Sequence, residues 1–262
     1  MNEPGPASVT LRIDGAVAHV RISNPGRRNA FTWSMYDELE QIAGRLRAEN
    51  DVRVVVLRGD REDGFAAGTD IAQFRDFADG AAGVDYERRV ARVLQAILDI
   101  PVPTVAAVER TAVGAGLAVA ACCDIVVAEE DARFGAPIAR TLGNCLPIAV
   151  VQRLRGRLGQ AAATGMLFTA ALVPAQQLTA SGFVHETAAP GELDGVVDAL
   201  VTRILRSAPL TLRALKEMNR RLDRAAPAPD DTDLLELCYG SADFREGVRA
   251  FTEHRYPEWK GN

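Results

Sequence analysis

The chain opens on two short segments in which hydrophobic and polar residues alternate. Residues 9–14 and 17–23 follow this pattern on either side of Asp14-Gly15, which predicts a β-hairpin. In residues 32–49 the apolar side chains lie three or four positions apart, which predicts an amphipathic helix. Continuous apolar runs predict strands at residues 51–58, 104–108 and 124–128, and the first is apolar enough to be buried on both faces.

The rest of the chain is mostly helical in its spacing of hydrophobic residues. Predicted helices lie at 86–99, 117–123, 147–158, 161–167, 175–181, 193–207, 210–223 and 231–251, and Pro227-Ala228-Pro229 separates the last two. The polar, Ala/Gly-rich stretch 73–84 predicts a mobile loop. Strands alternating with helices, followed by helices alone, indicate the α/β class with a core over residues 1–190 and a C-terminal helical module over residues 191–262.

Composition limits the kinds of partner. A chain of 262 residues that is 48% hydrophobic can form one large core with a small helical extension. The formal net charge of −5 disfavours nucleic acid as a partner. The N-terminus has no signal-peptide core, and the longest apolar stretch, 112–123, is too short to span a membrane. The adjacent Cys122 and Cys123 predict buried, reduced thiols, so we expect a cytoplasmic protein.

Metal chemistry finds no support in the sequence. The four cysteines form no CxxC pair and match no zinc pattern. The three histidines, His19, His185 and His254, lie far apart and fit structural or solvated roles better than catalytic ones. No group of histidine and acidic residues has the spacing of a ligand set, so we expect no metal.

Two glycine-bearing turns carry the strongest functional signal. Residues 64–70 and 112–118 each follow a predicted buried strand and lead into helix-compatible sequence. Small residues let a ligand approach the backbone, and a helix start leaves N–H groups without intrahelical partners. Two such turns, if they converge, form an oxyanion hole that stabilises negative charge on a carbonyl oxygen. Close helix–strand packing is the alternative explanation, and a dinucleotide site is disfavoured because the third small residue would fall on Val119.

A series of motifs extends this signal over nearly the whole chain. They are Asn24-Pro25-Gly26-Arg27-Arg28-Asn29-Ala30, Phe65-Ala66-Ala67-Gly68-Thr69-Asp70-Ile71, Gly114-Ala115-Gly116, Cys123-Asp124-Ile125, Ala132-Arg133-Phe134-Gly135-Ala136-Pro137, Gln152-Arg153-Leu154, residues 175–184, residues 243–251 and His254-Arg255-Tyr256-Pro257. In this order they resemble the crotonase superfamily, the enoyl-CoA hydratase/isomerase family. The resemblance implies a crotonase-like spiral of ββα units, a helical tail that forms trimers or hexamers, and an acyl-CoA thioester ligand. Coenzyme A enters as part of the substrate, and no other cofactor is expected.

The same resemblance assigns roles to individual residues. The oxyanion N–H donors are those of Thr69 and Ala115, and the backbone at Ala30 and Ala66 meets coenzyme A. Arg28 is placed to approach a CoA phosphate or is simply exposed. The other positions of the thioester site are Gly68, Asp70, Ile71, Gly114 and Ile138, and we expect Asp70 to cap the helix after its turn.

The chain departs from the hydratase pattern at two positions. Hydratases of this family typically carry two glutamates that activate water, and these positions are Ala118 and Ile138 here. Arg140, as a carboxylate binder, and Cys145, as a nucleophile, are side-chain candidates in the segment bordering the acyl pocket. Two functions therefore stay open: a hydratase, isomerase or related enolate enzyme with a different acid/base set, and a non-catalytic acyl-CoA binder.

Overall fold

The main sheet of the protein has six strands in the order β1-β2-β3-β4-β6-β9. The computed structural model describes residues 5–225 and 229–261, so part of Pro227-Ala228-Pro229 lies outside the described residues. Strands β1 and β2 form the predicted antiparallel hairpin, and every later pairing in this sheet is parallel. The strands span Ser8–Asp14 (β1), Val17–Ser23 (β2), Val54–Gly59 (β3), Thr104–Val108 (β4), Ile125–Glu129 (β6) and Glu186–Ala188 (β9).

A second, smaller sheet lies beside the main sheet and includes part of the second glycine-bearing turn. It has the order β5-β7-β8, with β5 parallel to β7 and β8 antiparallel to it. The strands span Thr111–Val113 (β5), Arg133–Gly135 (β7) and Val173–Pro174 (β8). They are too short to show any hydrophobic period, which is why the sequence did not predict them.

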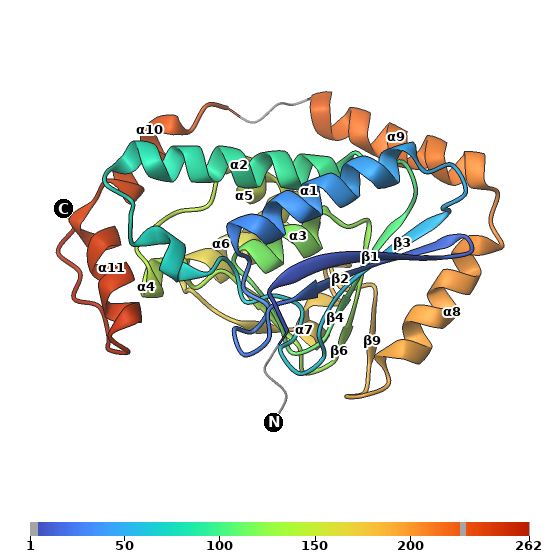
Figure 1. The fold of residues 1–262 in the computed structure, drawn as a ribbon, viewed down its shortest axis with the longest axis horizontal. Coiled ribbons are helices and arrows are strands. Elements are labelled where there is room, and N and C mark those ends of the chain that lie inside the picture. Colours follow the sequence, from blue (N-terminus) through green and yellow to red (C-terminus); the bar gives the residue numbers. More distant parts are fainter. Residues whose placement is uncertain (1–4, 226–228, 262) are drawn as a thin grey trace.

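Helices cover both faces of the main sheet, as Figure 1 shows. Helices α1 (Trp33–Ala48) and α2 (Gly80–Leu98) lie over one face and α8 (Leu193–Leu205) lies over the other. Alternate residues of β3 serve the two sides, because Val55 and Leu57 join the core under α1 and α2 while Val54 and Val56 pack with α8. The prediction that this strand is buried on both faces is therefore confirmed.

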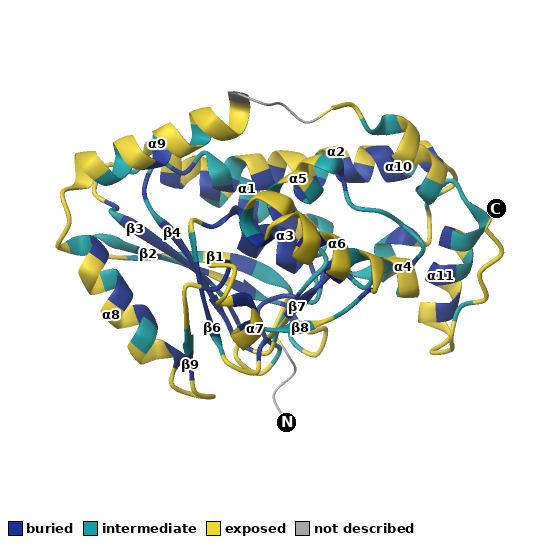
Figure 2. Cartoon of the chain, turned by 180° about the vertical axis from the view of Figure 1, so that it is seen from behind, coloured by how far each residue is buried: buried dark blue, intermediate teal, exposed yellow. Residues whose placement is uncertain are grey.

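The remaining helices complete the fold, and α9 is largely exposed in Figure 2. They span Ile71–Phe74 (the 3₁₀ helix η1), Ala115–Cys122 (α3), Ile138–Thr141 (α4), Ile148–Leu158 (α5), Gln160–Phe168 (α6), Ala175–Leu178 (α7), Pro209–Ala225 (α9), Thr232–Tyr239 (α10) and Ala242–Thr252 (α11). None of the helices in the described part of the chain is long and apolar enough to cross a membrane.

Two predicted elements need correction. The predicted loop 73–84 ends in the first turns of α2, which starts at Gly80 with Asp79 as its N-cap. A Cβ on Gly83 would lie 2.1 Å from Cγ of Tyr239, so the glycines that suggested a loop instead let α10 pack closely on the helix. The predicted single helix 231–251 is two helices, because Gly240 ends α10 and the Ser241 hydroxyl caps α11 by accepting from the Phe244 N–H.

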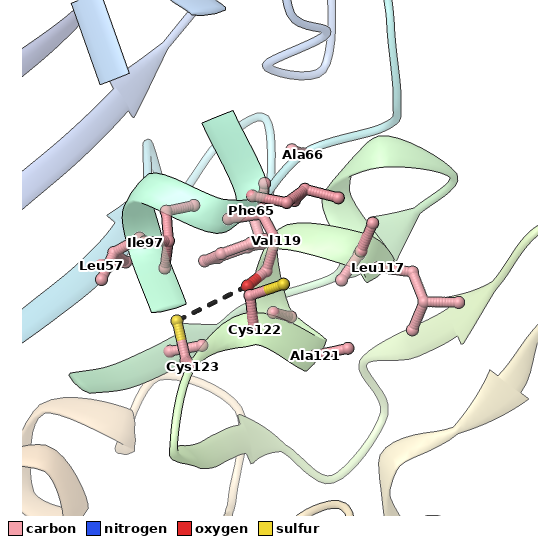
Figure 3. Close-up of a cluster of buried hydrophobic side chains, with 14 of the residues drawn as sticks. Leu57, Phe65, Ala66, Ile97, Leu117, Val119, Ala121, Cys122 and Cys123 are labelled. Atoms are coloured by element: carbon pink, nitrogen blue, oxygen red, sulfur yellow. Dashed lines mark hydrogen bonds between the residues drawn. The ribbon is translucent and has the colours of Figure 1, made fainter. Parts of the chain in front are cut away.

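Helix α3 is the most deeply buried helix near the turns, and Figure 3 shows its surroundings. Cys122 and Cys123 lie there among the side chains of Leu57, Phe65 and Ile97. Both thiols are free, and Cys123 Sγ lies 3.6 Å from the Val119 carbonyl oxygen, to which it donates. Burial raises the pKa of Cys122 to about 11, so these cysteines are inert core thiols, as the sequence predicted.

Candidate functional site

The two glycine-bearing turns lie side by side. Ala66 pairs with Ala112 in a parallel bridge, and the Val113 N–H donates to the Ala66 carbonyl across 2.9 Å. Further along, a Cβ on Gly68 would lie 3.9 Å from the Ala115 nitrogen, and one on Gly114 would lie 3.6 Å from the Gly68 Cα. The structure thus brings the two predicted turns together at Gly68 and Gly114.

Glycine is required at these points for two different reasons. Gly68 and Gly114 have φ values of 108° and 55°, in the region that L side chains rarely adopt. Gly116 has no such strain, but a Cβ there would lie only 2.2 Å from the Ala66 carbonyl oxygen. Close packing therefore explains Gly116, while the sharp reversals at Gly68 and Gly114 aim the backbone that follows them.

The backbone N–H groups of Thr69 and Ala115 follow directly after these reversals. Phe31 donates to the Gly68 carbonyl and accepts from the Asp70 N–H, so the intervening Thr69 N–H points away from Phe31. Ala115 is the first residue of α3, where an N–H has no intrahelical acceptor. Within the described residues neither N–H donates a hydrogen bond, so both remain available for a carbonyl oxygen.

The side chain of Thr69 is held from behind by two tyrosines. Its hydroxyl lies 2.7 Å from the Tyr36 hydroxyl of α1 and 2.7 Å from the Tyr86 hydroxyl of α2. Both phenols are buried, and burial raises their pKa values well above the usual range, so both are neutral donors and acceptors. These bonds fix the turn that carries the Thr69 N–H.

The residues assigned to coenzyme A surround the same turns. Arg28 is exposed at a φ of 51°, and its N–H donates to Asp63 across 3.2 Å. Ala30 is half-buried, Ala66 is buried, and Ile71 packs partly against the core. The expected cap is confirmed, because Asp70 Oδ1 accepts from the Ala72 N–H across 3.1 Å at the start of η1.

The two positions that depart from the hydratase pattern are apolar in their setting. Ala118 is buried on α3, one turn beyond Ala115, and Ile138 is the half-buried first residue of α4. Arg140 on α4 is exposed, and within the described residues its guanidinium makes no hydrogen bond or ion pair. It therefore has no structural partner that would explain its presence.

Cys145 is a poor nucleophile in this structure. Its thiol is half-buried and lies 3.7 Å from the Leu234 carbonyl oxygen, to which it donates. Burial raises its pKa far above the usual range, and Cys238, Glu87 and Asp231 raise it further. A thiolate would need neighbours that lower the pKa, so this setting argues against nucleophilic catalysis.

The buried carboxyl of Glu87, which was not predicted from the sequence, lies close to Cys145. Glu87 on α2 is 5% exposed and accepts a hydrogen bond from the Tyr239 hydroxyl on α10. Asn144 Nδ2 donates to the same hydroxyl across 2.9 Å. The signal was present in the sequence, because Glu87 precedes Val90 and Leu94 by three and seven positions and so shares the apolar face of its helix.

Burial dominates the protonation of this carboxyl. It raises the pKa of Glu87 to about 8, with a smaller rise from Asp231 and an opposing effect of the hydrogen bond from Tyr239. A group with this pKa can both take up and release a proton near neutral pH. Among the described residues no cluster of histidine, cysteine and acidic side chains could hold a metal ion.

Comparison with known proteins places this chain in a family. The sequence profile of the enoyl-CoA hydratase/isomerase family matches residues 12–262. A Thermus thermophilus protein, named only provisionally as an enoyl-CoA hydratase, is 34% identical over 94% of this chain and 98% of its own length. The crotonyl-CoA hydratase of Syntrophomonas wolfei is 31% identical over 95% of this chain and 96% of its own.

Solved structures agree with the sequence match. The structure of an enoyl-CoA hydratase/carnithine racemase from Magnetospirillum magneticum superposes with a TM-score of 0.79 at 30% identity, over 97% of this chain and 96% of that one. The expected crotonase-like fold with a helical C-terminal region is therefore confirmed. The chain belongs to the enoyl-CoA hydratase/isomerase family.

Proposed function

We propose that this protein is an acyl-CoA thioester enzyme in which the N–H groups of Thr69 and Ala115 stabilise a thioester enolate. The observation that carries the proposal is the pairing of two turns in which the N–H groups of Thr69 and Ala115 have no acceptor within the described residues. A thioester carbonyl oxygen placed between them would gain negative charge when a proton leaves the adjacent carbon. Preorganised N–H donors stabilise that charge without reorganising during the reaction.

The reaction class that fits best is proton transfer next to the thioester carbonyl, as in isomerisation, rather than standard hydration. Addition of water needs a positioned general acid or base, and Ala118 and Ile138 cannot supply one. The same two apolar residues also favour a second candidate, a non-catalytic acyl-CoA binder. Exchange of the hydrogens next to the thioester carbonyl separates the two, since a mere binder does not catalyse it.

The decisive variant is Ala115→Pro, tested with butyryl-CoA. Proline is tolerated at the first position of a helix, where a ring carbon replaces the amide hydrogen and the donor is lost. We expect at least about 10²-fold slower hydrogen exchange of butyryl-CoA in D₂O, as for loss of other oxyanion donors. Ala115→Ser, which keeps the N–H, is the matched control, and Thr69→Pro should repeat the effect at the other donor.

Calorimetric titration with butyryl-CoA accompanies these rates. A wild-type protein that binds butyryl-CoA and exchanges its hydrogens supports the enzyme. Binding without exchange favours the non-catalytic binder. Folded Ala115→Pro and Thr69→Pro proteins with wild-type affinity and exchange would overturn the role of both N–H groups.

A further inference from the structure

The carboxyl of Glu87 belongs to a series of contacting side chains that begins at Thr69 of the candidate oxyanion site. Its neighbour on α2, Tyr86, reaches the hydroxyl of Thr69. The ring of Tyr239, which donates to Glu87, lies 6.0 Å from the ring of Tyr86 in an edge-on arrangement. A continuous set of contacts therefore joins Thr69 to the buried carboxyl.

Asn144 extends the hydrogen bond between Tyr239 and Glu87 into a chain with a defined order of donors and acceptors. Its Nδ2 donates to the Tyr239 oxygen, and the Tyr239 hydroxyl donates to Glu87, so the three groups form one ordered chain of hydrogen bonds. The Oδ1 atom of Asn144 is buried and has no partner among the described residues. An unpaired buried acceptor is costly, so a donor such as a bound water or a ligand group would relieve this cost.

The cluster joins three segments of the chain, and holding these segments together would not by itself require polar side chains. Glu87 comes from α2, Tyr239 from α10, and Asn144 from the segment between α4 and α5. Aromatic rings of Phe77, Phe244 and Tyr86 surround Tyr239 and already hold α10 against this part of the core. Burial of a carboxyl among these rings costs free energy. A role of the carboxyl in proton transfer would explain why this cost is tolerated.

We propose that Glu87 and Tyr239 are the proton-transfer pair of the acyl site, an inference that rests on the acyl-CoA function proposed above. The C–H bond next to the thioester carbonyl breaks, its electron pair forms the enolate double bond, and the carbonyl oxygen takes up the negative charge between Thr69 and Ala115. The proton goes to the Tyr239 oxygen as the tyrosine passes its own proton to the Glu87 carboxylate. The reverse transfers return a proton to carbon, so atoms and charge balance over the cycle.

The charged surroundings set the direction of the pH dependence. The titratable groups that interact with Glu87 or Tyr239 are Tyr36, Tyr86, Asp231 and Cys145, and none of them can carry a positive charge. Burial and Asp231 both favour the protonated carboxyl, which holds its pKa near 8. Because the ionised form accepts the proton, exchange should rise with pH up to that range and level off above it.

The test compares Glu87→Gln with Asp85→Asn in hydrogen exchange of butyryl-CoA in D₂O between pH 6 and 9. Glutamine can still accept from Tyr239 but cannot take up a proton, so we expect about 10²-fold slower exchange and loss of the rise with pH. Asp85 lies on the same helix but is exposed, where it pairs with Arg88, so its variant should keep the wild-type rate and profile. Tyr239→Phe, which keeps the ring, should lose exchange as Glu87→Gln does.

Binding of butyryl-CoA, measured by calorimetry on each variant, separates the two levels of the proposal. Wild-type protein that does not bind butyryl-CoA overturns the acyl-CoA function and the inference with it. Wild-type protein that binds without exchange is a non-catalytic binder, which overturns the proposed enzyme and the inference with it. Glu87→Gln with wild-type exchange and pH profile overturns the inference alone. If the role of Glu87 is purely structural, Glu87→Gln is less stable than the wild type, but its folded fraction still exchanges hydrogens faster as the pH rises.

Discussion

At the scale of single residues, the candidate site depends on backbone groups aimed by glycine and fixed by side chains. Gly68 and Gly114 reverse the chain just before Thr69 and Ala115. The hydroxyls of Tyr36 and Tyr86 then hold Thr69 in place. The N–H donors are thus preorganised by two different means, backbone conformation and buried hydrogen bonds, which is what charge stabilisation requires.

The absence of the two hydratase glutamates, at Ala118 and Ile138, leads to a prediction about the rate of hydration. With Ala118 and Ile138 in the site, purified protein should hydrate crotonyl-CoA far more slowly than the rates typical of good enzymes, about 10–10³ per second. The oxyanion donors can polarise the thioester, but these positions offer no base for water. Loss of the enoyl absorbance, followed beside an established hydratase as control, measures the rate.

Hydration at those typical rates would contradict this interpretation of Ala118 and Ile138. It would mean that another group, such as Glu87 with Tyr239, activates water as well as carbon acids. Glu87→Gln tested in the same assay would then show whether that carboxyl is responsible.

Some residues of the site could be predicted from sequence and others could not. The two glycine-bearing turns could be recognised from local sequence, and the family resemblance then assigned the N–H donors to Thr69 and Ala115. Glu87, Asn144 and Tyr239 meet only because α10 packs on α2, a contact between residues far apart in sequence. No local pattern encodes such a meeting, although the place of Glu87 on an apolar helix face hinted at burial.

At the scale of elements, length decided what the sequence could predict. The hairpin and the buried strands have enough residues to show a period, whereas β5 and β7 have three residues each. These short strands form because the turns that follow β4 and β6 pair through their backbone groups. The start of α2 was missed for another reason, since Gly80 and Gly83 allow the close approach of Glu236 and Tyr239 on α10 rather than forming a loop.

Helix α9 is fastened to the main sheet by one buried cation. Lys216 is 7% exposed, and its Nζ donates to the Val102 carbonyl across 2.8 Å and to Asp124 Oδ2 across 2.7 Å. Asp124 Oδ2 also accepts from the Thr104 N–H at the start of β4. The cluster ties α9 to the beginnings of β4 and β6, so it joins the helical tail to the core.

Lys216→Met should therefore destabilise the protein by about 2–3 kcal/mol. The variant keeps much of the buried stem but leaves Asp124 without its cation, and the partial exposure of that carboxylate keeps the cost below that of a fully buried pair. Urea unfolding at pH 7 measures the change. The control is Arg221→Met on the same helix, an exposed residue paired with Glu217, which should cost less than about 1 kcal/mol.

Equal unfolding midpoints for the two variants would show that Lys216 does not fasten α9 to the sheet. A loss confined to Lys216→Met supports the tie. Circular dichroism of both variants before unfolding ensures that the comparison starts from folded protein.

At the scale of the whole molecule, the helical tail shows two faces with different tasks. On α9 the side with Lys216 and Arg220 is turned to the core. The opposite side carries a stripe of Leu215, Met218 and Leu222, which are 52%, 58% and 72% exposed. Their spacing of three and then four residues places them in one row, and Figure 2 shows the helix as largely exposed.

An exposed apolar row of this kind predicts self-association, and the family resemblance implies a trimer or a hexamer. Burial of large apolar side chains contributes roughly 1.5–3 kcal/mol each, so covering the row would favour assembly. Light scattering should give at least three times the chain mass of 28.1 kDa for the wild type. Leu215→Glu combined with Leu222→Glu should shift the mass toward that of one chain, because it places charge in the covered row. Asn219→Glu, the control, adds charge beside the row and should leave the mass unchanged. A wild-type protein that stays monomeric at micromolar concentration would rule out the assembly.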